Sequence, residues 1–424
     1  MASGPQVRDR PDPDQRPPAA ASVPTGDSTG DSTGADPEPG TATRPVPSRP
    51  WLVSLGVGLG WALVVRVAAL LVATGSRWML QEGSRGARPL GRGLDVWFRW
   101  DAINLAKIAE HGYLSHTGDP AYPAHQTAFF PGFPLALRAV GWVVGDLRVA
   151  GLLLSFAASV VAFTMLNRLA ERRWPGTGGL AVPLLACSPP GVFLIAGYTE
   201  ALFLAGAITA WYLATTGRWW WSALPAGVAV ATRTVGIALV AGLAVEYLAQ
   251  RRFRPRALRP DVLALVLALV PLAAWMAWLA WRAGDPMRFA ADQRAGWGRQ
   301  LTGPLEALRT TLRGDYGDAD TTWVFTWRLE LVGAVIGLAL LVWCLRPREA
   351  EWGWATYTGL TMAAYLLSTW YFSIPRGLLG LFPLPLLVAR ALRGRDQLFA
   401  ALLAASAALF SLGVAVFVRG PWVG

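Results

Sequence analysis

Residues 51–75 read WLVSLGVGLGWALVVRVAALLVATG, a run in which Arg66 is the only charged side chain. A helix of about 20 apolar residues is long enough to cross the hydrocarbon core of a bilayer. No short apolar segment followed by a cleavage site precedes this run. We therefore expect residues 51–75 to form a first membrane span that acts as its own uncleaved insertion signal.

Composition extends this interpretation to the rest of the chain. The sequence is 54% hydrophobic and contains 22 Trp, and its apolar residues come in long runs. These features predict an all-α polytopic membrane protein. The predicted bundle has about eleven transmembrane helices, at 51–75, 149–167, 178–196, 199–216, 219–233, 235–250, 261–282, 327–345, 352–371, 376–391 and 398–418.

The first 50 residues differ in composition from the remaining chain. They are rich in Pro, Gly, Ser, Thr and Asp, include GDSTGDSTG, and contain no apolar run. Such a segment is predicted to be disordered. We expect a cytoplasmic tail at 1–50 and one transmembrane domain at 51–424, with large extracytoplasmic loops at 76–148 and 283–326.

The arginines predict the orientation in the membrane. The formal charge is +11, but the basic residues cluster in short loops between apolar runs, as membrane orientation requires, and no nucleic-acid binding is indicated. If residues 129–144 lie at the interface or re-enter, all strongly basic short loops share one side; if they cross, the loop at 171–174 moves outside. We favour the interfacial interpretation, with the amino terminus cytoplasmic in a multi-pass protein of the cell membrane.

The polar stretch at 97–134 is the main candidate for a functional site. A helix over 99–111 would place Asp101, Asn104 and His111 on one face, because residues three, four and seven apart share a side. Four further charged residues belong to turns or loops predicted on the same side of the membrane: Glu200, Arg233, Arg294 and Arg376. We expect a charged cavity there, since charges near a bilayer usually have a role or a partner.

Each of these residues also has a purely structural interpretation. Asp101 could cap a helix, Glu200 could occupy a favourable first-turn position, and His111 could be an interfacial histidine. Arg376 is predicted at a helix start, where the dipole disfavours a cation, and this favours a phosphate-facing role. No metal site, disulfide or cofactor is predicted from Cys187 and Cys344, although a divalent cation remains open.

Four strings in order carry a resemblance to a known family: RWDAINLAKIAEHGY at 99–113, AFFPGFP at 128–134, GYTEALFLA at 197–205 and ATRTVGIAL at 231–239. The chain resembles the PIG-V-type mannosyltransferases, related to GPI mannosyltransferase 2, of the GT-C glycosyltransferase superfamily. The family often has His three residues after the loop Asp, where this chain has Asn104. No proton-transfer role is therefore assigned to Asn104.

The resemblance implies a membrane enzyme that transfers mannose, with inversion, from a polyprenyl-phosphate sugar donor to an extracytoplasmic hydroxyl. It implies an acidic catalytic residue in the first loop, at the position of Asp101, and we expect Asp101 to act as the general base because the acceptor hydroxyl must lose its proton. The other candidates are assigned to substrate binding. The acceptor stays open among glycolipid, glycan and protein. A transporter or lipid-linked sugar flippase is the alternative function, and a non-enzymatic partner in a glycosylation complex would share the fold without the chemistry.

The arginine distribution makes a topological prediction. A tag inserted in the basic loop at 250–259 should be accessible only from the cytoplasm, and a tag near Gly118 only from outside, because positively charged short loops stay inside. Protease or thiol-labelling accessibility in intact cells measures both. Two tags on the same side would contradict the predicted topology.

Overall fold

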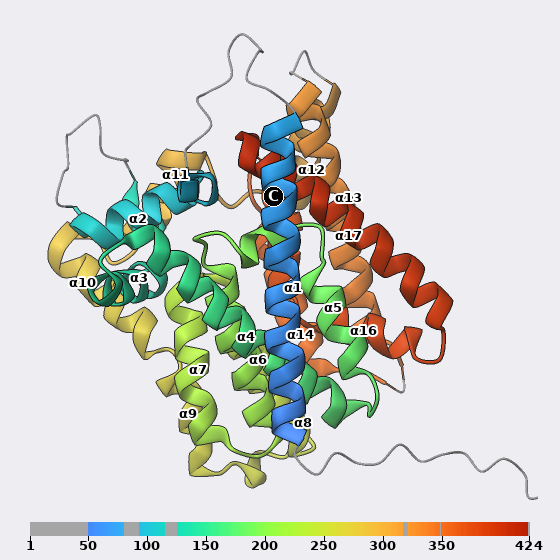
Figure 1. The fold of residues 1–424 in the computed structure, drawn as a ribbon. Helices are drawn as coiled ribbons and strands as arrows, with labels where there is room; N and C mark the ends of the chain where they lie inside the picture. The colour runs from blue at the N-terminus through green and yellow to red at the C-terminus, as the bar shows by residue number, and fades with distance from the viewer. Residues whose placement is uncertain (1–49, 80–92, 115–124, 317–320, 348, 423–424) are drawn as a thin grey trace, which may run out of the picture. The chain divides into compact units, whose positions relative to one another are not determined.

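The computed structural model describes residues 50–79, 93–114, 125–316, 321–347 and 349–422 (Figure 1). Within these ranges the regular structure is helical, and the β-type pairing is an isolated bridge between Leu301 and Ser368. The predicted all-α class is confirmed. The residues of the predicted disordered tail lie outside the described ranges, apart from Pro50, and so does Gly118.

The elements of the described ranges are α-helices (α) and short 3-10 helices (η). The first part contains α1 (Pro50–Met79), η1 (Gly93–Trp97), α2 (Asp101–His111), η2 (Gln126–Ala128), α3 (Gly132–Val144), α4 (Leu147–Arg173), α5 (Gly178–Ala186), η3 (Gly191–Leu194), α6 (Glu200–Thr215), α7 (Trp219–Thr232) and α8 (Val235–Gln250). The second part contains η4 (Pro255–Ala257), η5 (Pro260–Val262), α9 (Leu263–Leu267), α10 (Val270–Ala283), α11 (Arg288–Trp297), α12 (Pro304–Tyr316), α13 (Thr321–Cys344), α14 (Trp352–Leu366), α15 (Ile374–Gly380), α16 (Pro383–Leu392) and α17 (Asp396–Arg419).

Fewer helices reach spanning length than the sequence predicts. By length and composition, four single helices qualify: Pro50–Ser76, Leu147–Arg173, Val324–Cys344 and Asp396–Arg419. Two bent pairs raise the number to six: Pro260–Leu267 with Val270–Ala283, bent by 42°, and Ile374–Gly380 with Pro383–Leu392, bent by 75°. The described chain is a multi-pass membrane protein with four to six such spans, and the prediction of about eleven is too high by this criterion.

The difference has a physical cause in helix length. The other predicted ranges do contain helices, but α6 and α8 have 16 residues each. At 1.5 Å per residue, such a helix covers about 24 Å, less than the roughly 30 Å of a bilayer core. The range 178–196 is interrupted as well, because α5 ends at Ala186, just before Pro189 and Pro190.

Helix α3 occupies the range whose placement the sequence left open. Its 13 residues cover about 20 Å, too short to cross, which agrees with the interfacial interpretation. Trp142 and Val143 are 88% and 78% exposed. Gly145, at φ 82°, ends α3, and Asp146 then caps α4 by accepting the backbone N–H groups of Arg148 and Val149. The hydrogen bond from Val149, followed by that from Arg148, holds the pKa of Asp146 below its ordinary value.

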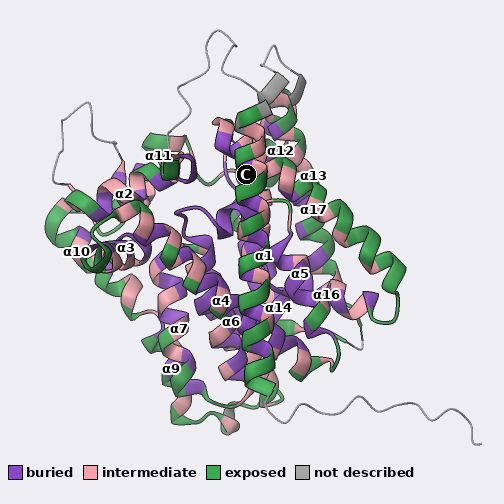
Figure 2. Cartoon of the chain, in the orientation of Figure 1, coloured by how far each residue is buried: buried purple, intermediate pink, exposed green. Residues whose placement is uncertain are grey.

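The buried core runs through the middle of the described bundle. Figure 2 shows buried residues along α4, α6 and α14 and exposed residues on the outward faces of α1 and α17. Many of the exposed residues are large and apolar, such as Leu71 on α1 and Leu409 on α17. An apolar outer surface over an apolar core is expected for helices that face lipid.

Gly58 allows α1 to pack closely against α4. A Cβ at this position would lie 2.3 Å from Oγ1 of Thr164, 2.8 Å from its backbone nitrogen and 2.9 Å from the carbonyl oxygen of Val160. Two of these three atoms are backbone and cannot swing away. Close backbone approach at a small residue is a common way for membrane helices to pack.

Gly58→Ala should therefore lower the free energy of unfolding by about 1 to 3 kcal/mol, the usual cost of overpacking. Gly60→Ala is the matched control, because a Cβ there meets nothing within 4 Å. Thermal unfolding of both variants in detergent micelles measures the difference. Equal melting temperatures for the two variants would show that α1 and α4 do not meet at Gly58.

Candidate functional site

Asp101 lies at the first position of α2, where the helix dipole favours an acidic side chain. The N-cap residue is Trp100, with φ 51°, and its side chain makes no capping hydrogen bond. The Asp101 carboxylate is also not used as a cap. Its Oδ2 instead accepts a hydrogen bond of 2.5 Å from Nη1 of Arg376.

The Arg376 guanidinium joins two carboxylates that are far apart in the sequence. Nη1 binds Asp101, and Nε donates to Oε1 of the buried Glu200. The rings of Phe193 and Tyr198 lie 5.0 and 4.7 Å from its Cζ, within the range of cation–π attraction. Acids and rings together fix the orientation of this side chain.

The position of Arg376 in the first turn of α15 is compensated locally. Glu330 of α13 accepts the backbone N–H groups of Ser373 and Ile374 at 2.6 and 2.7 Å, which places a carboxylate at the start of α15. This satisfies backbone donors that a helix start leaves open. The unfavourable dipole position predicted for this arginine is therefore offset by nearby carboxylates.

Arg233 ends α7 and completes the charged cluster. Its Nη1 donates to Oε1 of Glu200 and, at 3.3 Å, to Oγ1 of Thr199, while Nη2 lies 3.4 Å from the hydroxyl oxygen of Tyr365. A cation is favoured at the carboxyl end of a helix. The cluster of Asp101, Glu200, Arg233 and Arg376 thus contains two carboxylates and two guanidinium groups.

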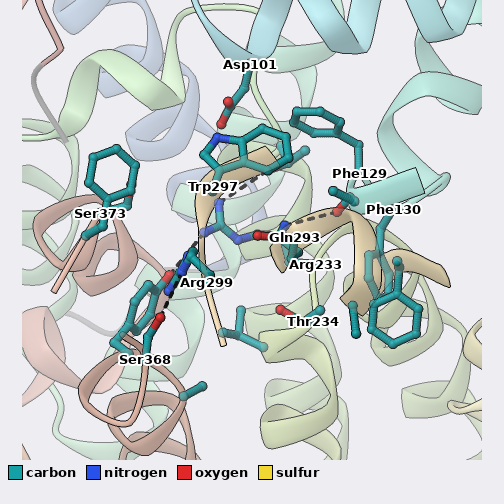
Figure 3. A pocket seen from close by; sticks show the side chains of 18 of the residues that line it. Asp101, Phe129, Phe130, Arg233, Thr234, Gln293, Trp297, Arg299, Ser368 and Ser373 are labelled. Carbon is teal, nitrogen blue, oxygen red and sulfur yellow. Dashed lines mark hydrogen bonds between the residues drawn. The ribbon is translucent and has the colours of Figure 1, made fainter. Parts of the chain in front are cut away.

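A cavity of about 800 Å³ opens beside this cluster. Its volume falls in the usual range for small-molecule sites. Figure 3 shows Asp101, Arg233 and Arg299 around it, with Phe129 and Phe130 on another side. The polar and aromatic lining residues include Trp100, Asp101, Asn104, Phe129, Phe130, Arg233, Phe289, Gln293, Arg294, Trp297, Arg299, Tyr365, Ser368, Phe372, Arg376 and Trp422.

The structure brings most of the predicted site residues to this cavity. Asp101, Asn104, Arg233, Arg294 and Arg376 line it. Two predicted residues are placed elsewhere. Glu200 is 2% exposed and lies behind the lining, bound by both arginines, and His111 lies at the end of α2 with Nε2 3.4 Å from the Glu110 carboxylate.

Sequence reasoning missed Arg299, which lines the cavity from the segment between α11 and α12. Its Nε donates to Oγ of Ser368 at 3.2 Å, and its Cζ lies 5.7 Å from the Tyr365 ring centre. Burial lowers the pKa of Arg299 from its ordinary value. Its place in the loop predicted at 283–326, without an acidic residue beside it in sequence, could have indicated Arg299 as a site residue.

Among the residues that the structure describes, no three or more His, Cys, Asp or Glu side chains come together in a group that could hold a metal ion. The chemistry that these residues offer is a carboxylate, an amide and several guanidinium groups around one cavity.

Fold and site define the class: an all-helical multi-pass membrane protein with a charged, partly aromatic cavity. No protein-family model matches the chain. Its sequence is similar to GPI alpha-1,6-mannosyltransferase 2 of Cricetulus griseus, with 38% identity over 154 residues, which cover 34% of this chain and 30% of that protein. The human protein of the same name is 37% identical over 153 residues, covering 33% of this chain and 29% of the human protein.

The predicted resemblance to the PIG-V-type mannosyltransferases is confirmed over the matched segment. The matched segment spans about 30% of the length of these relatives. Most of the length of each of these proteins therefore lies outside the matched segment.

Two solved structures are similar at 12% sequence identity. That of ArnT from Cupriavidus metallidurans bound to undecaprenyl phosphate has a TM-score of 0.49 and covers 85% of this chain and 76% of that chain. That of the archaeal oligosaccharyltransferase AglB from Archaeoglobus fulgidus, in complex with an inhibitory peptide and a dolichol-phosphate, has a TM-score of 0.41, with 86% and 56% covered. At this level of likeness neither ligand nor activity carries over to this chain.

The buried position of Glu200 predicts a structural role for its charge. Glu200→Gln would leave Arg233 and Arg376 with one carboxylate between them, and breaking a buried ion pair from one side typically costs about 3 to 5 kcal/mol. Glu110→Gln is the control, because the Glu110 side chain is 60% exposed. Apparent melting temperatures and folded yields in detergent compare the two. A Glu200→Gln protein as stable as the control would contradict the structural role.

Proposed function

We propose that this chain is a membrane mannosyltransferase that moves a mannosyl residue from a polyprenyl-phosphate donor to an acceptor hydroxyl, with inversion. The proposal is supported by the similarity to GPI alpha-1,6-mannosyltransferase 2 and by the charged cavity. Asp101 is the general base, and Asn104, His111, Glu200, Arg233, Arg294 and Arg376 are the proposed substrate-binding residues. Two of them, Glu200 and His111, do not line the cavity, and Glu200 acts through the arginines that it holds.

One observation carries the choice of base. The Asp101 side chain is 21% exposed and lines the cavity, whereas the Glu200 side chain is 2% exposed. In the described structure Arg376 binds Oδ2 of Asp101, and no bond occupies Oδ1. A general base must reach the proton that it removes, so Asp101 is favoured over Glu200.

The proposed step balances its atoms and charges. The acceptor oxygen forms a bond to the anomeric carbon while the bond from that carbon to the phosphate oxygen breaks. The acceptor proton goes to Asp101, and the electron pair of the broken bond leaves with the polyprenyl phosphate. A carboxylate for the proton and cations for the phosphate are the groups that such a transition state needs.

The charge of the cavity suits an anionic donor. Four arginines line it, Arg233, Arg294, Arg299 and Arg376, against one lining carboxylate, Asp101. Guanidinium groups bind phosphate through two parallel hydrogen bonds. Even with Glu200 included, the positive charges exceed the negative ones, so a ligand that brings negative charge is favoured.

The aromatic side of the cavity suits the apolar parts of the substrates. Phe129 and Trp297 meet edge to face with ring centres 5.5 Å apart, and Phe130 and Phe289 do the same at 5.5 Å. Rings arranged in this way offer flat apolar surface to an isoprenoid chain or to a sugar face. We propose an extracytoplasmic position for this cavity, with a glycolipid, glycan or protein acceptor and a cytoplasmic amino terminus.

The test uses purified protein, polyprenyl-phosphate-mannose and membrane acceptors. Asp101→Asn should lower kcat at least about a hundredfold, because an amide cannot take the acceptor proton. The control is Asp95→Asn, which changes a partly exposed acid paired with Arg148 away from the cavity lining and should keep its activity. Labelled mannose incorporated into product is the measurement, with GDP-mannose as a donor that should give no transfer.

Two outcomes would count against the proposed reaction, and a third would count against Asp101 as its base. Mannose transfer directly from GDP-mannose would show that the enzyme does not need a lipid-linked donor. Movement of the lipid-linked donor across vesicles without mannose transfer would favour the flippase alternative. Normal turnover of Asp101→Asn would move the base to another group while leaving the transferase reaction in place.

A further inference from the structure

The arginines of the cavity fall into two groups by their partners. Arg233 and Arg376 are bound by Asp101 and Glu200, so these four charges cancel. Arg294 and Arg299 form no ion pair with any residue that the structure describes. Arg294 is exposed, whereas Arg299 is partly buried within the lining.

The contacts of Arg299 are neutral. They are the hydroxyl of Ser368 and the ring face of Tyr365. Glu330 is the acid whose field reaches Arg299, but its two oxygens are bonded to the backbone N–H groups of Ser373 and Ile374. A partly buried guanidinium without a bonded carboxylate costs free energy unless an anion binds to it and balances its charge.

The backbone around Arg299 is held rigidly. The carbonyl of Gln300 accepts the N–H of Thr369 at 3.1 Å, and the carbonyl of Leu367 accepts the N–H of Thr302 at 2.8 Å. The Thr369 hydroxyl donates to the carbonyl of Gly298 at 2.9 Å. These bonds clamp the segment that carries Arg299 to the chain between α14 and α15.

Gly298 makes this clamp possible. It has φ 63°, and a Cβ there would lie 2.7 Å from the Trp370 ring. Only glycine adopts this conformation without cost and leaves room for the ring. The arginine that follows is therefore presented to the cavity from a fixed position, as a preorganised binding site requires.

We propose that Arg299, oriented by Ser368, binds the phosphate group of the lipid donor, while the substrate-binding arginines Arg233 and Arg376 also hold the carboxylates Asp101 and Glu200 in place. This assignment rests on the proposed function for the identity of the ligand. On this assignment, Arg299 binds only the phosphate, whereas Arg233 and Arg376 also bind the carboxylates. The group recognised is a phosphate. It can be esterified to a lipid, as in the proposed donor, or it can be free inorganic phosphate.

The test measures binding without any sugar transfer. Full-length protein in detergent micelles is titrated calorimetrically with farnesyl phosphate, with farnesol and with inorganic phosphate. Arg299→Ala should weaken farnesyl phosphate binding roughly tenfold or more, the usual worth of a hydrogen bond to a charged group. Binding of farnesol should not change, and Arg299→Lys should recover part of the loss because it keeps the charge without the fork.

Arg282→Ala is the matched control. Arg282 ends α10 as an exposed arginine beside Trp281 and does not line the cavity. This variant should bind farnesyl phosphate as the wild type does. If Arg299→Ala folds poorly, Ser368→Ala tests the same site through the group that orients Arg299.

The outcomes separate this inference from the proposed function. Farnesyl phosphate binding by Arg299→Ala or Ser368→Ala within about twofold of wild type, or no binding by the wild type, overturns the inference. Tight inorganic phosphate binding would make the site one for free phosphate. Asp101→Asn should keep farnesyl phosphate binding while losing transfer; a wild type that binds but never transfers overturns the function alone.

Discussion

The guanidinium of Arg376 is the contact on which the site depends. It ties α15 to Asp101 of α2, 275 residues away in sequence, and to Glu200 of α6, 176 residues away. Taking charges out of water costs several kcal/mol per ion, and only well-placed partners repay that cost. Since each charge of this cluster is bonded to an opposite one, three helices are fixed relative to one another at the edge of the cavity.

The sequence predicted which residues line this site better than it predicted which of their charges bind one another. Composition and arginine distribution placed Asp101, Arg233, Arg294 and Arg376 together, and the structure has all four in one cavity lining. The partners of each charge depend on how α2, α6 and α15 meet, and no local pattern encodes that. For the same reason the sequence did not show that Glu200 is enclosed by two arginines in the fold.

The membrane spans show the same division between local and tertiary information. Every apolar run predicted to cross contains helix, because apolarity and length are local properties. Fewer helices than predicted meet the length criterion for a full span, because Pro189 and Pro190 interrupt one run and α6 and α8 have 16 residues each. Short helices can be stable inside a bundle only when their ends find other partners, such as Glu330 at the start of α15.

The division of the arginines has a consequence for the chemistry. The bond from Arg376 to Oδ2 of Asp101 fixes the orientation of that carboxylate and leaves Oδ1 for the acceptor hydroxyl. On the proposed assignment, Arg299 holds the phosphate without drawing Arg376 away from Asp101, so the base keeps its geometry. Phosphate binding and proton removal then depend on different side chains that line one cavity.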